Sequence, residues 1–235
     1  MHKSQQQLHT TGPVVVIGAG LAGLTVALRL AQERPVVVLA KRNLDEAATA
    51  WAQGGIVGVL GSDDSIESHV RDTQDAGAGL VDEHTARFIA ERSARAVEWL
   101  VGEGVPFSAD PDGPLGLHLT REGGHAVRRI AHAADATGRA IHDALLAKAK
   151  AHPNVTLRER WMAVDLVTSR HLKDDESPRC HGVYALDIDS GLLFDEAATT
   201  EIYTRILART LHYAPPISAD AIGVGPVAGQ RAVEE

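Results

Sequence analysis

The stretch Val14–Leu24, VVVIGAGLAGL, decides the fold, because a run of branched apolar residues ends there in three glycines. Gly18, Gly20 and Gly23 have the G-x-G-x-x-G spacing. This spacing lets a chain turn tightly, brings its backbone against a pyrophosphate and starts a helix close to the sheet. The sequence therefore predicts a phosphate-binding turn, and the alternative is a tight strand-to-helix turn that binds nothing.

The residues on either side of the glycines support the first interpretation. GPVVVIG, residues 12–18, is typical of a fully buried parallel strand, and LAGLTVALRLAQE, residues 21–33, has apolar residues at helical spacing. A second apolar run, RPVVVLAK, occupies residues 34–41. Strand, glycine turn, helix and strand within about thirty residues form the unit that binds a dinucleotide.

The end of the second apolar run departs from the commonest nicotinamide-binding pattern. An acidic residue usually stands there to hold a ribose hydroxyl, whereas this chain has Leu39, Ala40 and Lys41. Lys41 is either a solvated strand end or a cation beside a pyrophosphate or ribose.

Composition limits the possible partners and compartment. The chain has 235 residues, a net charge of −8 and 44% hydrophobic residues, enough for a packed core in one large or two small domains. Its basic residues are scattered, so we expect no nucleic-acid or membrane partner. The single Cys180 excludes an intrachain disulfide and fits a reducing compartment. We interpret residues 1–12 as a disordered lead to a cytoplasmic protein, and the twelve histidines as lacking a tight metal-ligand cluster.

The rest of the chain alternates helices, turns and strands. Residues 42–65 read as an extended loop, and residues 64–105 as two or three amphipathic helices, the first capped by Ser65. A turn-rich segment, 106–125, precedes a helix that stops at Pro153 and three strands that end at Gly191. The apolar stripe of a later helix in 64–105 is predicted to be Ile89, Val97, Leu100 and Val101.

Two further segments carry a family resemblance: AATAWAQGGI, residues 47–56, and LTREGGHAVRRIAHAADATGRAIHDAL, residues 119–145. With them, the chain from Val14 to about Gly191 resembles the flavoprotein family of L-aspartate oxidases, relatives of the succinate dehydrogenase and fumarate reductase flavoprotein subunits. The glycine fingerprint, Lys41, the A-Q-G-G-I loop, the R-E-G-G-H box and the D-A-T-G helix start occur in family order.

The resemblance implies an α/β fold: a Rossmann-like, three-layer FAD-binding domain of the glutathione-reductase type over residues 13–191, incomplete relative to the family. It implies FAD in place of NAD, with backbone N–H groups of residues 48–55 facing the flavin. Ala48 stands where the membrane relatives have the histidine that bonds covalently to flavin, so we expect non-covalent FAD. The predicted cofactor contacts are Gly18, Ala19, Gly20, Leu21, Ala22, Gly23, Lys41, Ala48, Thr49, Ala50, Trp51, Ala52, Gln53, Gly54 and Gly55. Standing alone, the paired glycines Gly54 and Gly55 are also compatible with a simple turn.

Glu122 distinguishes among the relatives. Fumarate reductases typically have phenylalanine before the paired glycines of this box, whereas a carboxylate can hold the ammonium group of an amino acid. The alternative is a solvated loop carboxylate. We interpret the neighbouring His125, Arg128 and Arg129 as helix-face residues.

The implied reaction is oxidation of L-aspartate to iminoaspartate, the first step of de novo NAD biosynthesis, with hydride transfer from Cα to flavin N5. Oxygen or fumarate would then reoxidise the flavin, and the product would pass to quinolinate synthase. The alternatives are a soluble fumarate reductase or succinate dehydrogenase flavoprotein, and a non-catalytic FAD-binding remnant.

The resemblance stops at Gly191. The family continues there with a strand, a capping domain that carries the catalytic arginine and substrate-binding histidines, and a helical domain. Residues 192–235 instead predict one amphipathic helix, with Ile202, Ile206 and Leu207 on one face, and then a disordered tail. We therefore expect a truncated chain whose sheet edge and flavin are open to water.

Overall fold

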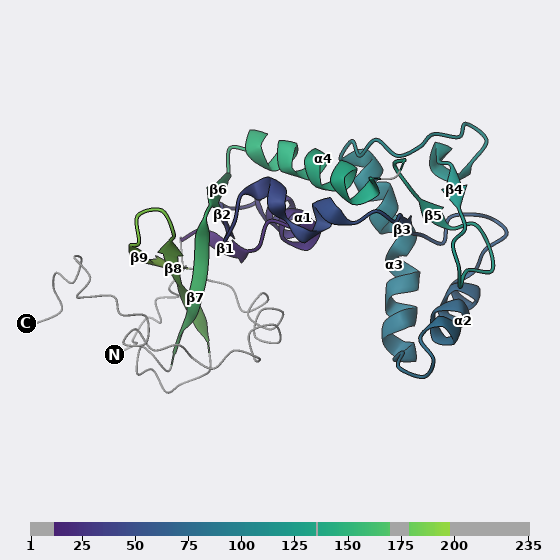
Figure 1. Cartoon of the computed structure of the whole chain (residues 1–235), viewed down its shortest axis with the longest axis horizontal. Helices are drawn as coiled ribbons and strands as arrows, with labels where there is room; N and C mark the ends of the chain where they lie inside the picture. The colour runs from purple at the N-terminus through teal and green to yellow at the C-terminus, as the bar shows by residue number, and fades with distance from the viewer. Residues whose placement is uncertain (1–11, 135, 170–178, 198–235) are drawn as a thin grey trace, which may run out of the picture. The chain divides into compact units, whose positions relative to one another are not determined.

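A computed structural model describes residues 12–134, 136–169 and 179–197 of the chain (Figure 1). The chain divides into two compact units. Among the described residues, the first unit combines those up to Leu44 with those from Ala149 onward, and the second unit consists of those from Asp45 to Lys148.

A parallel sheet forms the centre of the first unit. Its strands are β1 (Val14–Ile17), β2 (Val36–Ala40) and β6 (Val155–Glu159), in the order β1-β2-β6. Helix α1 (Leu21–Leu30) connects β1 to β2, which are parallel neighbours with Ile17 opposite Leu39. The predicted strand, glycine turn, helix and strand are therefore all present.

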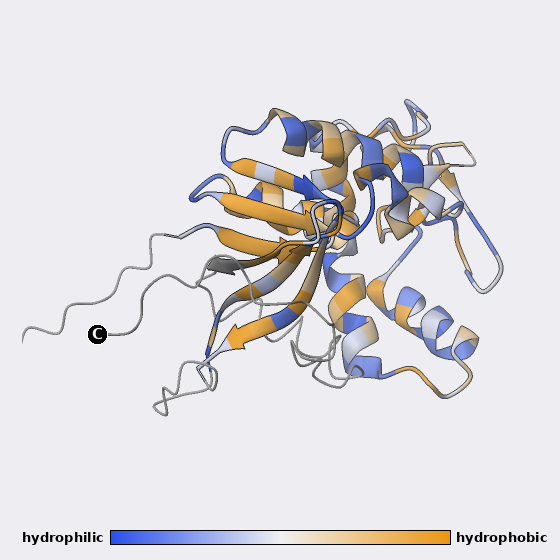
Figure 2. Ribbon diagram, turned by 60° about the vertical axis from the view of Figure 1, so that its left-hand side comes forward, coloured by the Kyte–Doolittle hydropathy of each residue, from blue (hydrophilic) through white to orange (hydrophobic). Residues whose placement is uncertain are grey.

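Alternation of side chains gives β1 and β2 two buried faces, and both strands consist of hydrophobic residues (Figure 2). Val15, Val37 and Leu39 form one core cluster with Val183 and Ala185. The intervening valines of β1 and β2 are buried on the opposite face, where α1 buries Leu24, Ala27 and Leu28.

The second layer against the parallel sheet is antiparallel. It consists of β7 (Trp161–Thr168), β8 (Cys180–Asp187) and β9 (Leu193–Ala197), in that order. Because β8 contributes Val183 and Ala185 to the shared core cluster, the unit has the layers helix, parallel sheet and antiparallel sheet. This is the three-layer α/β arrangement that the sequence predicts.

Strand β9 corrects the sequence interpretation beyond Gly191. One amphipathic helix was predicted within residues 192–235, but residues 193–197 pair with β8 in register, Leu193 opposite Leu186 and Ala197 opposite Gly182. The chain reverses at Gly191, which has φ +71°, and the open edge of β8 supplies backbone partners that outweigh the local helical spacing. The predicted helix face of Ile202, Ile206 and Leu207 lies outside the described residues.

The second unit contains two helices and a small sheet, together with most of a third helix, α4 (Thr137–Ala151). The two helices are α2 (Ile66–Ala76) and α3 (Glu83–Gly102), and the sheet has the antiparallel strands β3 (Ile56–Val57), β5 (Ile130–Ala131) and β4 (Leu119–Thr120), in the order β3-β5-β4. The sequence prediction missed these two-residue strands. Their core cluster is Val97, Leu117, Leu119 and Ala131.

The start of α2 agrees with the sequence prediction, whereas the buried face of α3 agrees with it only in part. Ser65 caps α2 as predicted, since its Oγ accepts the N–H of Ser68 at 3.1 Å. The buried face of α3 is Ala90, Ser93, Val97 and Leu100. Ile89 and Val101 were predicted to share it but are exposed, because each lies one residue, and so about 100°, away from the buried row.

Helix α4 (Thr137–Ala151) ends before Pro153, as predicted. The Asp135 of the D-A-T-G motif lies outside the described residues. The predicted extended loop, 42–65, contains two short 3₁₀ turns, η1 (Leu44–Glu46) and η2 (Ala48–Trp51), as well as β3. In the described part of the chain, every helix is too short or too polar to cross a membrane.

Candidate functional site

The glycine turn lies where β1 ends and α1 begins. Gly18 has φ +105°, a left-handed conformation that favours glycine, and its N–H donates to the carbonyl of Leu39 at 2.8 Å. Gly20 is the N-cap residue of α1 with an extended backbone. The turn is therefore held against the neighbouring strand while the helix starts directly after it.

Gly23 allows the close approach of helix and turn. A Cβ atom at this position would lie 1.9 Å from the carbonyl oxygen of Gly18 and 3.5 Å from Cγ1 of Val16. Any side chain would push α1 away from the end of β1. The third glycine of the fingerprint thus has the role in helix-strand packing that the motif requires.

The start of α1 is suited to an anion. Backbone N–H groups and the positive end of the helix dipole point out of a helix N-terminus, and residues 21–24 include no carboxylate that would compete for them. Lys41 follows β2 directly and is exposed. Since Ile17 and Leu39 are opposite each other in parallel strands, the glycine turn and Lys41 lie at the same carboxyl edge of the sheet, where open α/β sheets bind ligands. These residues fit the pyrophosphate of a dinucleotide.

The loop of residues 48–55 belongs to the second unit and is exposed over most of its length. Ala50 is buried, whereas residues 51–55 are exposed and the Trp51 side chain is 72% exposed. The N–H of Gly138, at the start of α4, donates to the carbonyl of Ala52 at 3.0 Å. A Cβ on Gly138 would lie 2.1 Å from the carbonyl oxygen of Thr49, so helix and loop touch through their backbones.

The paired glycines of this loop have different surroundings. A Cβ on Gly55 would lie 2.2 Å from Cγ2 of Ile130 and 2.5 Å from the carbonyl oxygen of Ala131. Among the described residues, no atom comes within 4 Å of the corresponding position on Gly54. Gly55 is therefore needed for packing against β5. Packing does not require glycine at position 54, and the open space beside Gly54 leaves room for a ligand.

Glu122 begins a tight turn in the loop that joins β4 to β5. The N–H of His125 donates to the carbonyl of Glu122 at 3.3 Å, and Gly124 has φ +87°. This is a β-turn with a left-handed third residue, the position at which such turns use glycine. Glu122 is exposed, and its role in holding an ammonium group stays a prediction.

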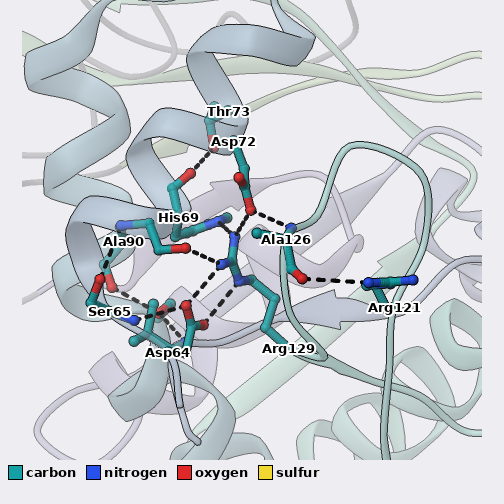
Figure 3. Close-up of polar contacts among 12 residues, drawn as sticks. Asp64, Ser65, His69, Asp72, Thr73, Ala90, Arg121, Ala126 and Arg129 are labelled. Carbon is teal, nitrogen blue, oxygen red and sulfur yellow. Dashed lines mark hydrogen bonds and ion pairs between the residues drawn. The ribbon is translucent and has the colours of Figure 1, made fainter. Parts of the chain in front are cut away.

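Arg129, immediately before β5, is fully buried at the centre of a polar cluster (Figure 3). Its guanidinium forms a bidentate pair with Asp64, with Nε–Oδ2 2.9 Å and Nη2–Oδ1 2.8 Å. Nη1 donates to Asp72 Oδ2 at 2.7 Å and to His69 Nδ1 at 3.1 Å, and Nη2 donates to Ser68 Oγ at 3.0 Å. Five hydrogen bonds thus use the five N–H donors of the group. We name Asp64, Ser68, His69, Asp72 and Arg129 the arginine cluster.

Burial, hydrogen bonds and the charges of this cluster together shift the pKa values of His69 and Asp72. Burial is the largest cause that lowers the pKa of His69 below its usual 6.5, and the positive charge of Arg129 adds to it. Burial acts to raise the pKa of Asp72, but the N–H of Ala126 and the Arg129 charge outweigh it, so this pKa is lowered. His69 is therefore neutral, with its proton on Nε2, because a guanidinium can only donate to Nδ1.

The arginine cluster corrects the interpretation of residues 125, 128 and 129 as helix-face residues. They lie in the loop before β5, and Arg129 is buried because the acceptors of α2 surround it. A sequence signal for this existed. Asp64, Ser68 and Asp72 are spaced by four residues. Asp64 lies just before the Ser65 cap and Ser68 and Asp72 share one face of α2, so two carboxylates close together need a cation.

A hollow of about 650 Å³ lies along the β4–β5 hairpin. Its lining is mixed in charge, since it includes Arg121 and Arg128 as well as Asp63. Glu122 is not among the described residues that line it, so the hollow gives no support to the predicted ammonium contact. The full lining is Asp63, His118, Leu119, Thr120, Arg121, Ala126, Val127 and Arg128.

Comparison with known families assigns the chain to one of them. The model of the FAD binding domain family matches residues 13–211, which include the turn, the 48–55 loop and Glu122. The chain belongs to this family. The prediction of FAD as the cofactor is thereby confirmed, and the match continues beyond Gly191, where the predicted domain ended.

Curated relatives and a solved structure agree with this assignment. The chain is similar to L-aspartate oxidase 1 of Ralstonia nicotianae, with 57% identity over 178 residues, and to L-aspartate oxidase of Pseudomonas aeruginosa, with 48% identity over 188 residues. These alignments cover 76% and 78% of this chain but 33% and 35% of the relatives, so the chain spans about a third of their length.

The solved structure is the FrdA subunit of Escherichia coli quinol fumarate reductase, which is 26% identical to this chain, with a TM-score of 0.70. That similarity covers 80% of this chain and 31% of FrdA. The predicted resemblance and fold class are confirmed.

Proposed function

We propose that this FAD binding domain serves an L-aspartate oxidase, which oxidises L-aspartate to iminoaspartate. The observation that carries the proposal is the 57% identity to an L-aspartate oxidase over a stretch that includes Glu122. FAD, when bound, supplies the acceptor for the two electrons removed with the Cα hydrogen. The chain's own residues bind the cofactor and orient the amino acid.

We assign the pyrophosphate to the turn of residues 18–23 and to Lys41. The supporting observations are the left-handed Gly18, the close contact at Gly23 and the anion-suited start of α1. We assign the flavin to the loop of residues 48–55, whose exposed backbone and open Gly54 leave space for it. Ala48 offers no nucleophile, so the cofactor is held without a covalent bond.

Glu122 selects the substrate in this proposal. Its exposed carboxylate accepts charge-assisted hydrogen bonds from the ammonium group of L-aspartate. A dicarboxylate without an amine, such as succinate, gains nothing from this contact. Oxygen or fumarate accepts the electrons. The oxidation is the first step of NAD biosynthesis, and its product passes to quinolinate synthase. The cytoplasmic location also stays a prediction.

The test uses the purified chain with FAD. A yellow protein that releases its flavin intact on acid precipitation supports non-covalent FAD, and a colourless protein that takes up no added FAD contradicts it. L-aspartate is then added without oxygen, and bleaching of the flavin supports oxidation. Succinate is added in parallel, because bleaching by succinate alone would overturn the role given to Glu122 and favour the fumarate reductase alternative.

A further inference from the structure

The turn of residues 122–125 is attached to α2 at two points. The first is a hydrogen bond of 2.7 Å from the N–H of Ala126 to Oδ2 of Asp72. The second is a stacking contact between the rings of His125 and His69, whose centroids are 6.1 Å apart with an interplanar angle of 23°. The attachments are made by His125 and Ala126, three and four residues after Glu122, to which we assign the substrate ammonium group.

Arg129 holds both attachment residues on α2. Its Nη1 atom donates two hydrogen bonds (Figure 3). One goes to Oδ2 of Asp72, the atom that also accepts the N–H of Ala126, and the other goes to Nδ1 of His69. The other side of the guanidinium is fixed by Asp64, whose side chain is fully buried. The planar group therefore sets the positions of the carboxylate and the imidazole at the same time.

Lysine could not replace this arrangement. An ammonium group is a compact charge with three donors, whereas the five contacts of Arg129 need the planar, five-donor fork of a guanidinium. A cluster built only to neutralise Asp64 and Asp72 would need a charge but no such geometry. Arg129→Lys keeps the positive charge and removes the planar fork, so this substitution tests the geometry separately from the charge.

We propose that Arg129 is a positioning residue, which keeps the Glu122 turn in one conformation through Asp72 and His69. The inference rests on the proposed function in one respect, that Glu122 contacts the amino-acid substrate. Arg129 itself is buried and does not touch substrate; it fixes the backbone that carries the carboxylate. Its loss weakens substrate binding by this turn and leaves the glycine turn of the first unit unaltered.

The test compares Arg129→Lys, Asp72→Asn and the control Asp75→Asn in the full chain. Asp72→Asn has nearly the shape of the original side chain and removes its negative charge, which weakens the hydrogen bonds that Oδ2 accepts from Ala126 and Arg129, so it covers the case in which Arg129→Lys fails to fold. Asp75→Asn makes the same change of charge one turn along α2, at an exposed position. Hydrogen exchange of residues 121–127 is followed by mass spectrometry, together with the dissociation constant for FAD and the concentration of L-aspartate that gives half-maximal flavin reduction.

We expect amide exchange in residues 121–127 to accelerate about tenfold or more in Arg129→Lys and Asp72→Asn, with exchange in α3 and the FAD dissociation constant unchanged. The half-maximal L-aspartate concentration should rise in the same two variants by a similar factor. Exchange equal to the control in Asp72→Asn and in any folded Arg129→Lys would overturn the inference. Faster exchange with an unchanged L-aspartate requirement would also overturn it. If L-aspartate does not reduce the flavin of the unsubstituted chain, the proposed function fails, and the exchange result still decides whether Arg129 positions the turn.

Discussion

A Cβ atom added to Gly23 would lie 1.9 Å from the carbonyl oxygen of Gly18. The two glycines are therefore a pair: one turns the chain with a left-handed backbone, and the other lets the helix begin against that turn. Their arrangement gives α1 the position at which its N-terminal backbone can meet a phosphate.

Gly23→Ala should abolish FAD binding, because α1 must move away from the end of β1 to admit the methyl group. The measurement is titration of the purified variant with FAD, followed by flavin fluorescence. Gly102→Ala is the matched control, since it adds the same methyl group at the end of α3, where no described residue has an atom within 4 Å. Equal FAD affinity in the two variants would contradict the role given to Gly23.

The paired glycines of the 48–55 loop should respond differently to the same substitution. Gly55→Ala places a methyl group 2.2 Å from Cγ2 of Ile130 and should lower the melting temperature of the chain. Gly54→Ala meets open space and should leave the melting temperature unchanged while weakening FAD binding, because the backbone there approaches the flavin in our proposal. Unaltered FAD affinity in Gly54→Ala would remove the assignment of the flavin to this position.

Trp51 should report FAD binding directly. Its side chain is 72% exposed in the 48–55 loop, so a flavin bound along the loop should quench its fluorescence. Trp51→Phe should remove most of the FAD-dependent decrease in tryptophan emission. Trp99→Phe is the matched control in α3 and should keep that decrease. A decrease of the same size in both variants would show that Trp51 is not near the flavin.

The cap of α2 should contribute measurably to stability. Ser65→Ala removes the acceptor for the Ser68 N–H and should lower the free energy of unfolding by about 1 kcal/mol. Urea unfolding measures this change, with Ser62→Ala, at an exposed position before the helix, as control. Because α2 carries most of the arginine cluster, a frayed start of this helix should also accelerate exchange in residues 121–127.

The sequence predicts the first unit well because its signals are local. Three glycines at fixed spacing between two valine-rich runs admit few structures, and the helix stop at Pro153 and the Ser65 cap are equally local. The burial of Arg129 depends on contacts with residues that precede it by 57 to 65 positions. The sequence of its own loop does not contain these partners, so its burial could not be predicted from that loop. Strand β9 was missed for a similar reason, since the free edge of β8 decides its conformation.

The arginine cluster should make the second unit sensitive to acid. The pKa of His69 lies below 6.5 and that of Asp72 below 3.8 in the folded chain, so the unfolded chain binds more protons in both ranges. The free energy of unfolding therefore falls as the pH drops from 6.5 toward the lowered pKa of His69, and falls again below about pH 4 as Asp72 is protonated. Urea unfolding at a series of pH values measures both steps.

His69→Asn separates the two steps. Asparagine can present an oxygen near the place of Nδ1, accept the Arg129 donor and carry no titrating group. This variant should lose the step below pH 6.5 and keep the step near pH 4, whereas Asp72→Asn should do the reverse. The control His84→Asn, at the exposed start of α3, should keep both. A step below pH 6.5 that persists in His69→Asn would assign the step to another titrating group and would contradict the role given to His69.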